Sequence, residues 1–225
     1  MSGILRSLVP GSVRRRILSR AAEALRRMRS EEESGLPGVP LGAEHVDGCR
    51  VLLDREALIG VLERNAVAAE IGVFRGDFSA SILRVSAPAR LHLVDSWDPA
   101  RVDPGMAGEV AERFAEEADR GSVVIHRKAS VDAAADFPDS YFDWIYLDSD
   151  HSYGTTRDEL AAYAGKVKEG GIIAGHDYSM GNWVAGLRYG VIEAVHEFCV
   201  GSGWKLVYIT AEPGEKQSFA ITRIR

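Results

Sequence analysis

The stretch Val67-Ala68-Ala69-Glu70-Ile71-Gly72-Val73-Phe74-Arg75-Gly76-Asp77 decides the fold. Residues 67–73 form a nearly continuous apolar run, which is typical of a strand buried on both faces. Gly72 and Gly76 let the backbone pass close to a ligand, because no side chain stands in the way. Helical spacing of apolar residues follows from Phe78 to Val85. The stretch therefore predicts a buried strand, a glycine turn and a helix.

The same alternation continues along the chain. Further strands are predicted at residues 91–95, 123–125, 142–148 and 172–175, and helices at residues 55–64, 106–120, 155–168 and 191–199. Strands that alternate with helices predict a parallel sheet with right-handed crossovers. The last two strands, residues 204–209 and 218–224, are joined by a turn-rich segment and are expected to pair antiparallel. We predict an α/β fold, with a Rossmann-like seven-stranded, mostly parallel sheet, the last strand antiparallel, and helices on both faces.

The composition is that of a globular protein. The chain has 225 residues, of which 46% are hydrophobic and 27% charged, and its formal net charge is −6. No apolar run approaches the roughly 20 residues that a membrane-spanning helix needs. Cys49 and Cys199 lie far apart and form neither a disulfide framework nor a cysteine metal site. A reducing, cytoplasmic location is therefore expected.

Positive charge is concentrated at the N-terminal end. Residues 1–30 hold eight arginines and one acid, which gives +7 and leaves −13 for the other 195 residues. Between Val13 and Met28 the apolar residues fall on one helical face, with most arginines opposite. Glu31–Glu33 and the segment of residues 34–40, which is rich in Gly and Pro, are expected to end the helix. We interpret residues 1–41 as a basic amphipathic helix and linker, and residues 42–225 as the main domain.

Three roles are open for this basic helix. It could lie on an anionic membrane or on nucleic acid. It could be an Arg-rich targeting peptide, although no apolar core or cleavage signal supports secretion. Its apolar face could instead pack on the domain or on a second subunit. We favour packing, and with it a dimer, over a peripheral membrane contact, and the acidic domain argues against a nucleic-acid partner.

Polar residues follow the predicted strands where each strand ends. Asp95, Asp148 and the pair His176–Asp177 stand at these positions, and Gly72 ends the first strand. One such aspartate would be explained by capping of the next helix. Ligands of parallel sheets bind beyond the carboxyl ends of the strands. Several polar residues together with a glycine turn therefore predict a shared crevice at this edge.

The first two strand ends indicate the kind of cofactor. Asp95 lies 25 residues after Glu70, and an acid at the end of the second strand can bind both hydroxyls of a ribose. The spacing Gly72-x-x-x-Gly76 differs from the dinucleotide fingerprint, and Asp77 at the helix start would repel a pyrophosphate. Glu70 could attract a cation. A cofactor with a ribose and a positive centre fits better than one with phosphates.

At this point the chain resembles the class I S-adenosylmethionine-dependent methyltransferases. The segment Glu70–Gly76 is similar to their E-x-G-x-x-x-G loop. Residues 147–153, 170–178 and 190–198 resemble small-molecule O-methyltransferases such as the macrocin-type sugar O-methyltransferases. The resemblance covers about residues 55–225 and leaves out the basic helix. It implies methyl transfer from S-adenosyl-L-methionine to a hydroxyl of a sugar, polyketide or catechol-like small molecule.

The resemblance also implies a donor site. Its lining residues would be Glu70, Gly72, Gly76, Asp95, Ser96, Trp97 and Ser130. Asp95 would hold the ribose hydroxyls, Trp97 would lie by the adenine or the ribose, and Ser130 would contact the adenine. The plain alternatives are a rim aromatic without a ligand for Trp97 and a helix N-cap for Ser130.

A metal site is implied in the same way. In the O-methyltransferases that the chain resembles, carboxylates hold a Mg2+ ion that binds two substrate oxygens. Asp148 and Asp177 match two of those ligands, but His176 stands where an acid is usual, and Mg2+ prefers oxygen ligands. Asp150 is the candidate that compensates. Without a metal, His151 or His176 would be the general base. The catalytic candidates are thus Asp148, His151 and His176, and the metal candidates Asp148, Asp150, His176 and Asp177.

Other classes of function compete with this interpretation. A nicotinamide-dependent oxidoreductase would use a related sheet, but the missing third glycine, Asp77 and the final hairpin count against it. A non-catalytic cofactor-binding protein would leave the basic helix as the functional part, and the acid–histidine set argues against that. A nucleic-acid methyltransferase is disfavoured by the acidic domain and by the lack of a base-pocket motif of the Asn-Pro-Pro-Tyr type.

Overall fold

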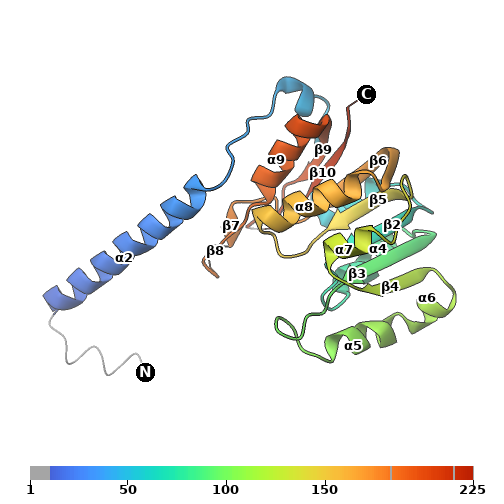
Figure 1. Ribbon diagram of the computed structural model, residues 1–225, viewed down its shortest axis with the longest axis horizontal. Helices are drawn as coiled ribbons and strands as arrows, with labels where there is room; N and C mark the ends of the chain where they lie inside the picture. Colours follow the sequence, from blue (N-terminus) through green and yellow to red (C-terminus); the bar gives the residue numbers. More distant parts are fainter. Residues whose placement is uncertain (1–10, 183, 215, 225) are drawn as a thin grey trace. The chain divides into compact units, whose positions relative to one another are not determined.

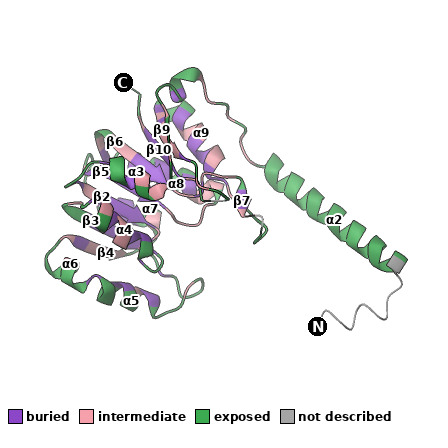
Figure 2. Ribbon diagram, turned by 180° about the vertical axis from the view of Figure 1, so that it is seen from behind, coloured by how far each residue is buried: buried purple, intermediate pink, exposed green. Residues whose placement is uncertain are grey.

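The structure is a computed structural model that describes residues 11–182, 184–214 and 216–224. The chain divides into two compact units, one before Gly38 and one from Gly38 to Arg225. The first contains α2 (Gly11–Ser34), whose side chains from residue 12 onward are exposed (Figure 2). The helix runs through Glu31–Glu33, which we expected to end it, because glutamate is a good helix former. It ends where Gly35 and Pro37 follow.

An eight-stranded sheet forms the centre of the second unit, in the order β1-β9-β10-β6-β5-β2-β3-β4 (Figure 1). The strands are β1 (Arg50–Leu52), β2 (Val67–Ile71), β3 (Arg90–Asp95), β4 (Val123–Arg127), β5 (Phe142–Leu147), β6 (Val167–Gly175), β9 (Trp204–Thr210) and β10 (Phe219–Arg223). β10 is antiparallel to both of its neighbours, β6 and β9, and the other pairs are parallel. The predicted α/β fold and antiparallel final pair are confirmed, and β1 adds an eighth strand beside β9.

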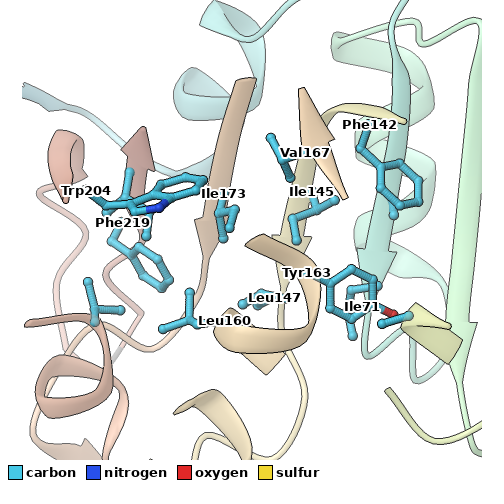
Figure 3. Packing of buried hydrophobic residues seen from close by; sticks show 14 of the residues in the cluster. Ile71, Phe142, Ile145, Leu147, Leu160, Tyr163, Val167, Ile173, Trp204 and Phe219 are labelled. Carbon is cyan, nitrogen blue, oxygen red and sulfur yellow. The ribbon is translucent and has the colours of Figure 1, made fainter. Parts of the chain in front are cut away.

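Helices cover both faces of the sheet. α3 (Arg55–Val61), α4 (Asp77–Val85) and α5 (Met106–Arg113) pack on one face, and α7 (Ser130–Ala134), α8 (Tyr153–Ala164) and α9 (Val191–Ser202) pack on the other. Successive side chains of β2 point to the two faces in turn, as in any strand. Ala68 packs in the core under α3, α4 and α5, and Ala69 packs in the core under α7, α8 and α9. Figure 3 shows Leu160 and Tyr163 of α8 against the second face.

The smaller elements lie outside these layers. A short pair, β7 (Gly181–Asn182) and β8 (Leu187–Arg188), forms a separate sheet. A 3-10 turn, η1 (Ala43–His45), precedes β1. None of the described helices is both long enough and apolar enough to cross a membrane.

Two predicted boundaries are wrong for physical reasons. The helix expected over residues 106–120 divides at Phe114 into α5 and α6 (Ala115–Asp119). The helix expected to reach Lys168 ends at Ala164, and β6 begins at Val167, where that residue pairs with Phe142 of β5. Strand pairing overrides the local helix preference there.

Candidate active site

A cavity of about 840 Å³ opens at the carboxyl ends of β2, β3, β5 and β6. Its volume is in the range of small-molecule sites. Among the residues predicted from the sequence, those that line it are Glu70, Gly72, Asp95, Ser96, Ser130, Asp148, Asp150, His151 and His176. Gly76, Trp97 and the metal candidate Asp177 are not part of its wall. The predicted donor and metal residues thus meet at one edge of the sheet.

Gly72 joins the ends of β2 and β5. Its φ is +91°, and a Cβ built there would lie 2.2 Å from the backbone oxygen of Asp148. Gly72 N–H donates to the carbonyl of Val94 at 2.8 Å, and Asp148 N–H donates to the carbonyl of Ile71 at 2.7 Å. Only glycine allows both the positive φ and this close approach.

Asp95 shapes the glycine turn. Its Oδ2 accepts hydrogen bonds from the N–H groups of Val73 and Phe74, each at 2.9 Å, and its Oδ1 accepts one from Trp97 at 2.7 Å. A carboxylate offers about four acceptor positions, so one of them is open to a ligand in the cavity wall. Ribose binding by Asp95 stays a prediction, while its contact with the turn was not foreseen.

Trp97 lies beneath the turn. Its side chain is 1% exposed, and its indole Nε1–H donates to the carbonyl of Phe74 at 2.8 Å. The structure therefore places Trp97 neither at the rim nor on the cavity wall beside an adenine. Phe74 and Trp97 both have positive φ, at 51° and 41°. Bulky residues adopt this conformation rarely, and such strain concentrates at functional sites.

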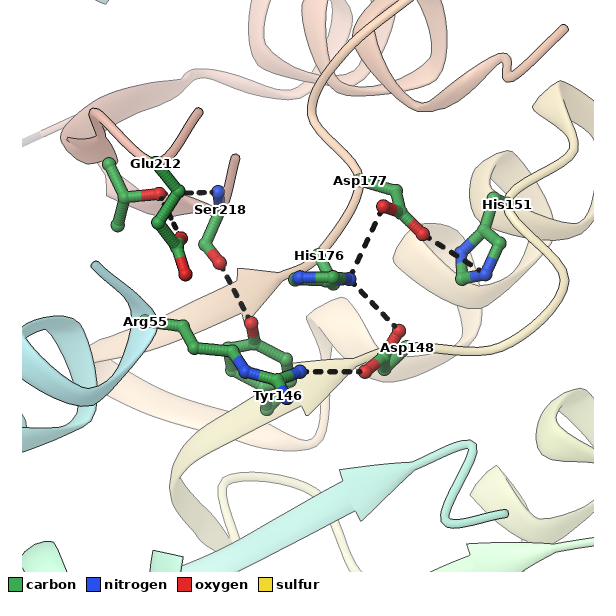
Figure 4. Close-up of polar contacts among 9 residues, drawn as sticks. Arg55, Tyr146, Asp148, His151, His176, Asp177, Glu212 and Ser218 are labelled. Carbon is green, nitrogen blue, oxygen red and sulfur yellow. Dashed lines mark hydrogen bonds and ion pairs between the residues drawn. The ribbon is translucent and has the colours of Figure 1, made fainter. Parts of the chain in front are cut away.

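An acid–histidine cluster stands beside the turn (Figure 4). His151 Nε2 is 3.1 Å from Asp177 Oδ2, and His176 Nδ1 is 3.5 Å from Asp148 Oδ1 and 3.3 Å from Asp177 Oδ1. One ligand atom from each of Asp148, His151 and Asp177 lies within 4.8 Å of the others. His151 and Asp177 have φ of 61° and 52°, so strained backbone again marks this edge.

Asp150 does not join that cluster, although it was a candidate ligand. Its Oδ1 accepts a hydrogen bond from Ser152 N–H and its Oδ2 one from the Thr155 hydroxyl, each at 3.0 Å. These bonds hold the start of α8. Arg101 adds an ion pair to Oδ2 at 3.8 Å. Among the side chains that could hold a metal ion together, His151 takes the place that we had assigned to His176.

His176 lies between the two carboxylates. Burial opposes its charge, but hydrogen bonds to Asp148 and Asp177 and their negative charges outweigh burial and raise its pKa to about 9. Its buried Nε2 has no hydrogen-bond partner among the described residues. At neutral pH the imidazole is therefore charged, and it holds the two acids side by side.

Glu70 is a buried acid at the end of β2. Its side chain accepts a short hydrogen bond from the Ser79 hydroxyl. Burial raises the pKa of Glu70 well above its ordinary value, and the charges of Asp148 and Asp95 act in the same direction. A positive group that entered the cavity beside Glu70 would favour its ionised form.

Two residues of this region were missed from the sequence. Arg55, the first residue of α3, reaches the cavity with its guanidinium carbon 4.3 Å from the ring centroid of Phe78. Glu159 of α8 is buried near Ser130 and Ser149, and burial raises its pKa to about 7. No motif marks either position, because Arg55 precedes the first motif strand and Glu159 reads as an ordinary polar residue of a helix.

The sheet order, the antiparallel β10 and the cavity over the glycine turn define the class I methyltransferase fold. A family model described as a methyltransferase domain matches residues 69–178, which contain the turn and the acid–histidine cluster. The matched segment and the fold are similar to those of the class I S-adenosylmethionine-dependent methyltransferases. No curated protein matches the chain.

Solved structures share the fold at low sequence identity. The pyocyanin biosynthetic protein PhzM has a TM-score of 0.58 and 15% identity, over 76% of this chain and 55% of that one. An rRNA methylase of Streptococcus thermophilus has a TM-score of 0.54 and 11% identity, over 76% and 95%. The tRNA methyltransferase TrmK of B. subtilis has a TM-score of 0.54 and 12% identity, over 77% and 67%. Their different substrates mean that the fold alone does not define the acceptor.

Proposed function

We propose that this chain transfers a methyl group from S-adenosyl-L-methionine to a hydroxyl oxygen of a small molecule, with a divalent cation held by Asp148, His151 and Asp177. One observation carries the proposal: the acid–histidine cluster shares a wall with the glycine turn. A Cβ at Gly72 would lie 2.2 Å from the backbone of Asp148. A donor on the turn and an acceptor on the cluster would therefore be neighbours, and such positioning is the main source of rate in methyl transfer.

The candidate ligands Asp148, His151 and Asp177 support a divalent cation, but not specifically Mg2+. Ligand bonds of about 2.1 Å place the ligand atoms of one ion roughly 3–4 Å apart, which is compatible with three atoms that lie within 4.8 Å of one another. The imidazole of His151 departs from the all-oxygen sites that Mg2+ prefers and suits Mn2+, Fe2+ or Zn2+ better. When bound, such an ion supplies Lewis acidity that favours the ionised form of an acceptor hydroxyl.

The protein's own groups define the surroundings of that hydroxyl. His176, charged between Asp148 and Asp177, keeps the two acids together. His151 is partly exposed toward the cavity, and Asp177 orients its ring. The same pair supports a metal-free variant of the proposal, in which His151 accepts the hydroxyl proton as a general base.

Charge favours a small acceptor over a nucleic acid. The cavity wall carries seven acids, Glu70, Asp77, Asp95, Asp98, Asp148, Asp150 and Asp158, against three arginines, Arg55, Arg75 and Arg101. Nucleic-acid binding depends on cations that neutralise phosphates, and this wall repels them. The rRNA and tRNA methylases with the same fold are 11% and 12% identical and support only the fold.

Calorimetry and Mn2+ electron paramagnetic resonance test the proposal. We expect micromolar binding of S-adenosylhomocysteine and a bound Mn2+ signal from the wild-type chain. Asp148→Asn and Asp177→Asn should remove the Mn2+ signal and lower turnover on the order of 100-fold or more, while donor affinity changes little. Asp150→Asn is the matched control and should keep the metal, because its carboxylate is used at the start of α8.

Three results would contradict parts of the proposal. A wild-type chain that does not bind S-adenosylhomocysteine would refute the donor. If chelated protein keeps full turnover and only His151→Gln loses activity, the reaction needs no metal, and His151 acts as the general base. Equal loss of the Mn2+ signal in Asp150→Asn and Asp148→Asn would show that the cluster is not the metal site.

A further inference from the structure

Arg55 is a cation at one end of the cavity. It is the first residue of α3, directly after the N-cap Asp54, whose side chain accepts a hydrogen bond from Ala57 N–H at 2.7 Å. The guanidinium lies over the ring of Phe78, with 4.3 Å between the guanidinium carbon and the ring centroid. The cap and the ring hold this side chain at the cavity wall.

The N–H groups of Arg55 are available to a ligand. Its Nη1 is 3.7 Å from Asp148 Oδ2, which is an ion pair but too long for a hydrogen bond (Figure 4). Within the residues that the structure describes, the guanidinium donates no hydrogen bond to another side chain or backbone group. The side chain is 34% exposed. A guanidinium presents several N–H donors in one plane, and a planar carboxylate can accept two of them together.

The strand order places Arg55 at the far end of the cavity from the ribose acid. Asp95 ends β3 and Asp148 follows β5, with β2 between them. Adjacent strands are about 4.8 Å apart, so the two acids are separated by roughly 10 Å. A donor whose ribose lies at Asp95 and whose chain crosses the glycine turn therefore directs its amino-acid end toward Asp148 and Arg55.

We propose that Arg55 binds the carboxylate of the amino-acid end of the methyl donor. The inference rests on the proposed function, which supplies the donor. The amino-acid end carries a carboxylate and an ammonium group. Arg55 matches the first, and the acid Glu70, close enough to feel the charge of Arg55, matches the second. The wall thus places a positive and a negative side chain next to each other, as the carboxylate and the ammonium group of an amino acid need.

The other two arginines of the wall are placed differently. Arg101 is 65% exposed and pairs with Asp150 at 3.8 Å, at the start of α8. Arg75 stacks on Phe74, with 5.5 Å between the guanidinium carbon and the ring centroid, on the outer side of the turn. Arg55 is therefore the arginine that reaches the ends of β2 and β5.

Two nucleosides distinguish carboxylate binding by Arg55 from a general effect of the substitution on the cavity. S-adenosylhomocysteine has the amino-acid end, and 5′-methylthioadenosine has the same nucleoside and sulfur without it. Titration calorimetry on the full chain should show that Arg55→Met weakens S-adenosylhomocysteine at least tenfold and leaves 5′-methylthioadenosine unchanged. Arg55→Lys should keep part of the affinity, since an ammonium pairs with a carboxylate but lacks the planar fork. Arg101→Met is the matched control and should bind both compounds like the wild type.

The outcomes distinguish the inference from the proposed function. Unchanged binding of S-adenosylhomocysteine by Arg55→Met would overturn the assignment of Arg55 and leave the donor intact. Equal weakening of both compounds would overturn it as well, because the loss would then come from the shape of the cavity. A wild-type chain that binds neither compound would overturn both proposals. Melting temperatures of the variants show that each is folded.

Discussion

At the residue scale, Gly72 is the contact between the donor turn and the acid–histidine cluster. Its positive φ excludes ordinary side chains, and the backbone of Asp148 occupies the position that a Cβ would need. The second restriction is the stronger one, because backbone atoms cannot rotate away as a side chain can. The position thus couples the geometry of two strand ends, one at the glycine turn and one at the acid–histidine cluster.

Gly72→Ala should be severely destabilising. We expect a loss of about 4 kcal/mol or more in the free energy of unfolding, because the ends of β2 and β5 must separate. Gly121→Ala is the matched control: Gly121 also has positive φ, 72°, but no atom lies within 4 Å of its Cβ position. It should lose only the 1–2 kcal/mol that the left-handed backbone costs. Urea unfolding of the two variants measures the difference, and equal losses would contradict the close approach.

The acids of the site could be predicted from the sequence, but the residues that they and Trp97 contact could not. Glu70, Asp95, Asp148 and Asp177 are recognisable because each stands where an apolar run ends. The role of Trp97 depends instead on the turn, which brings the Phe74 carbonyl to its indole nitrogen. Whether Asp150 or His151 faces the cluster depends on the positive φ of His151, and alternation of apolar residues carries no information on that angle.

At the scale of elements, the strands buried on both faces were the easiest to predict. β2, β3 and β5 are apolar runs because helices cover both of their faces. β1 was missed because it is a three-residue edge strand, and all three of its residues pair with β9, which lies near the other end of the chain. The start of β6 was missed because the half-buried Lys168 and the exposed Glu169 are polar and give no apolar signal.

A pair of histidines, the buried His92 and the half-buried His126, links β3 and β4. His92 Nδ1 is 2.9 Å from His126 Nε2, and His92 Nε2 is 3.2 Å from the Tyr141 hydroxyl. Burial, with smaller contributions from His126 and Arg90, lowers the pKa of His92 to about 4. An unfolded histidine has a pKa near 6.5, so between these values the unfolded chain binds a proton that the folded chain does not.

Stability should therefore be lost through this pair as the pH falls from 6.5 toward 4. By pH 5 this difference in proton binding at His92 has lowered the free energy of unfolding by about 2 kcal/mol. Glu70 and Glu159 have raised pKa values and act in the opposite direction, so the informative quantity is the difference between the wild type and His92→Gln. Urea unfolding should show the advantage of the wild type shrinking by about 2 kcal/mol between pH 7.5 and pH 5. An advantage that does not change with pH would contradict a buried His92 that stays neutral in the folded chain.

At the scale of the whole molecule, the cavity and both core clusters, among the described residues, belong to the unit that begins at Gly38. We expect a chain without residues 1–37 to keep its melting temperature within a few degrees and its affinity for S-adenosylhomocysteine within twofold. Scanning calorimetry and titration calorimetry measure the two quantities. A large loss of either would mean that the basic helix contributes to the domain or to the donor site.

The basic helix supports a prediction about assembly. Val13, Ile17, Leu25 and Met28 of α2 are 46%, 58%, 52% and 68% exposed, and an amphipathic helix gains most of its stability by burying such a face. We propose that two copies of the chain pair through this stripe, so that the full chain is a dimer and the chain without residues 1–37 a monomer in light scattering. Ile17→Glu with Leu25→Glu should give a monomer, whereas Arg15→Gln with Arg26→Gln, on the opposite face, should remain a dimer. A monomeric full chain that sediments with anionic vesicles and not with neutral ones, and that dissociates from them as salt rises, would instead establish the membrane contact.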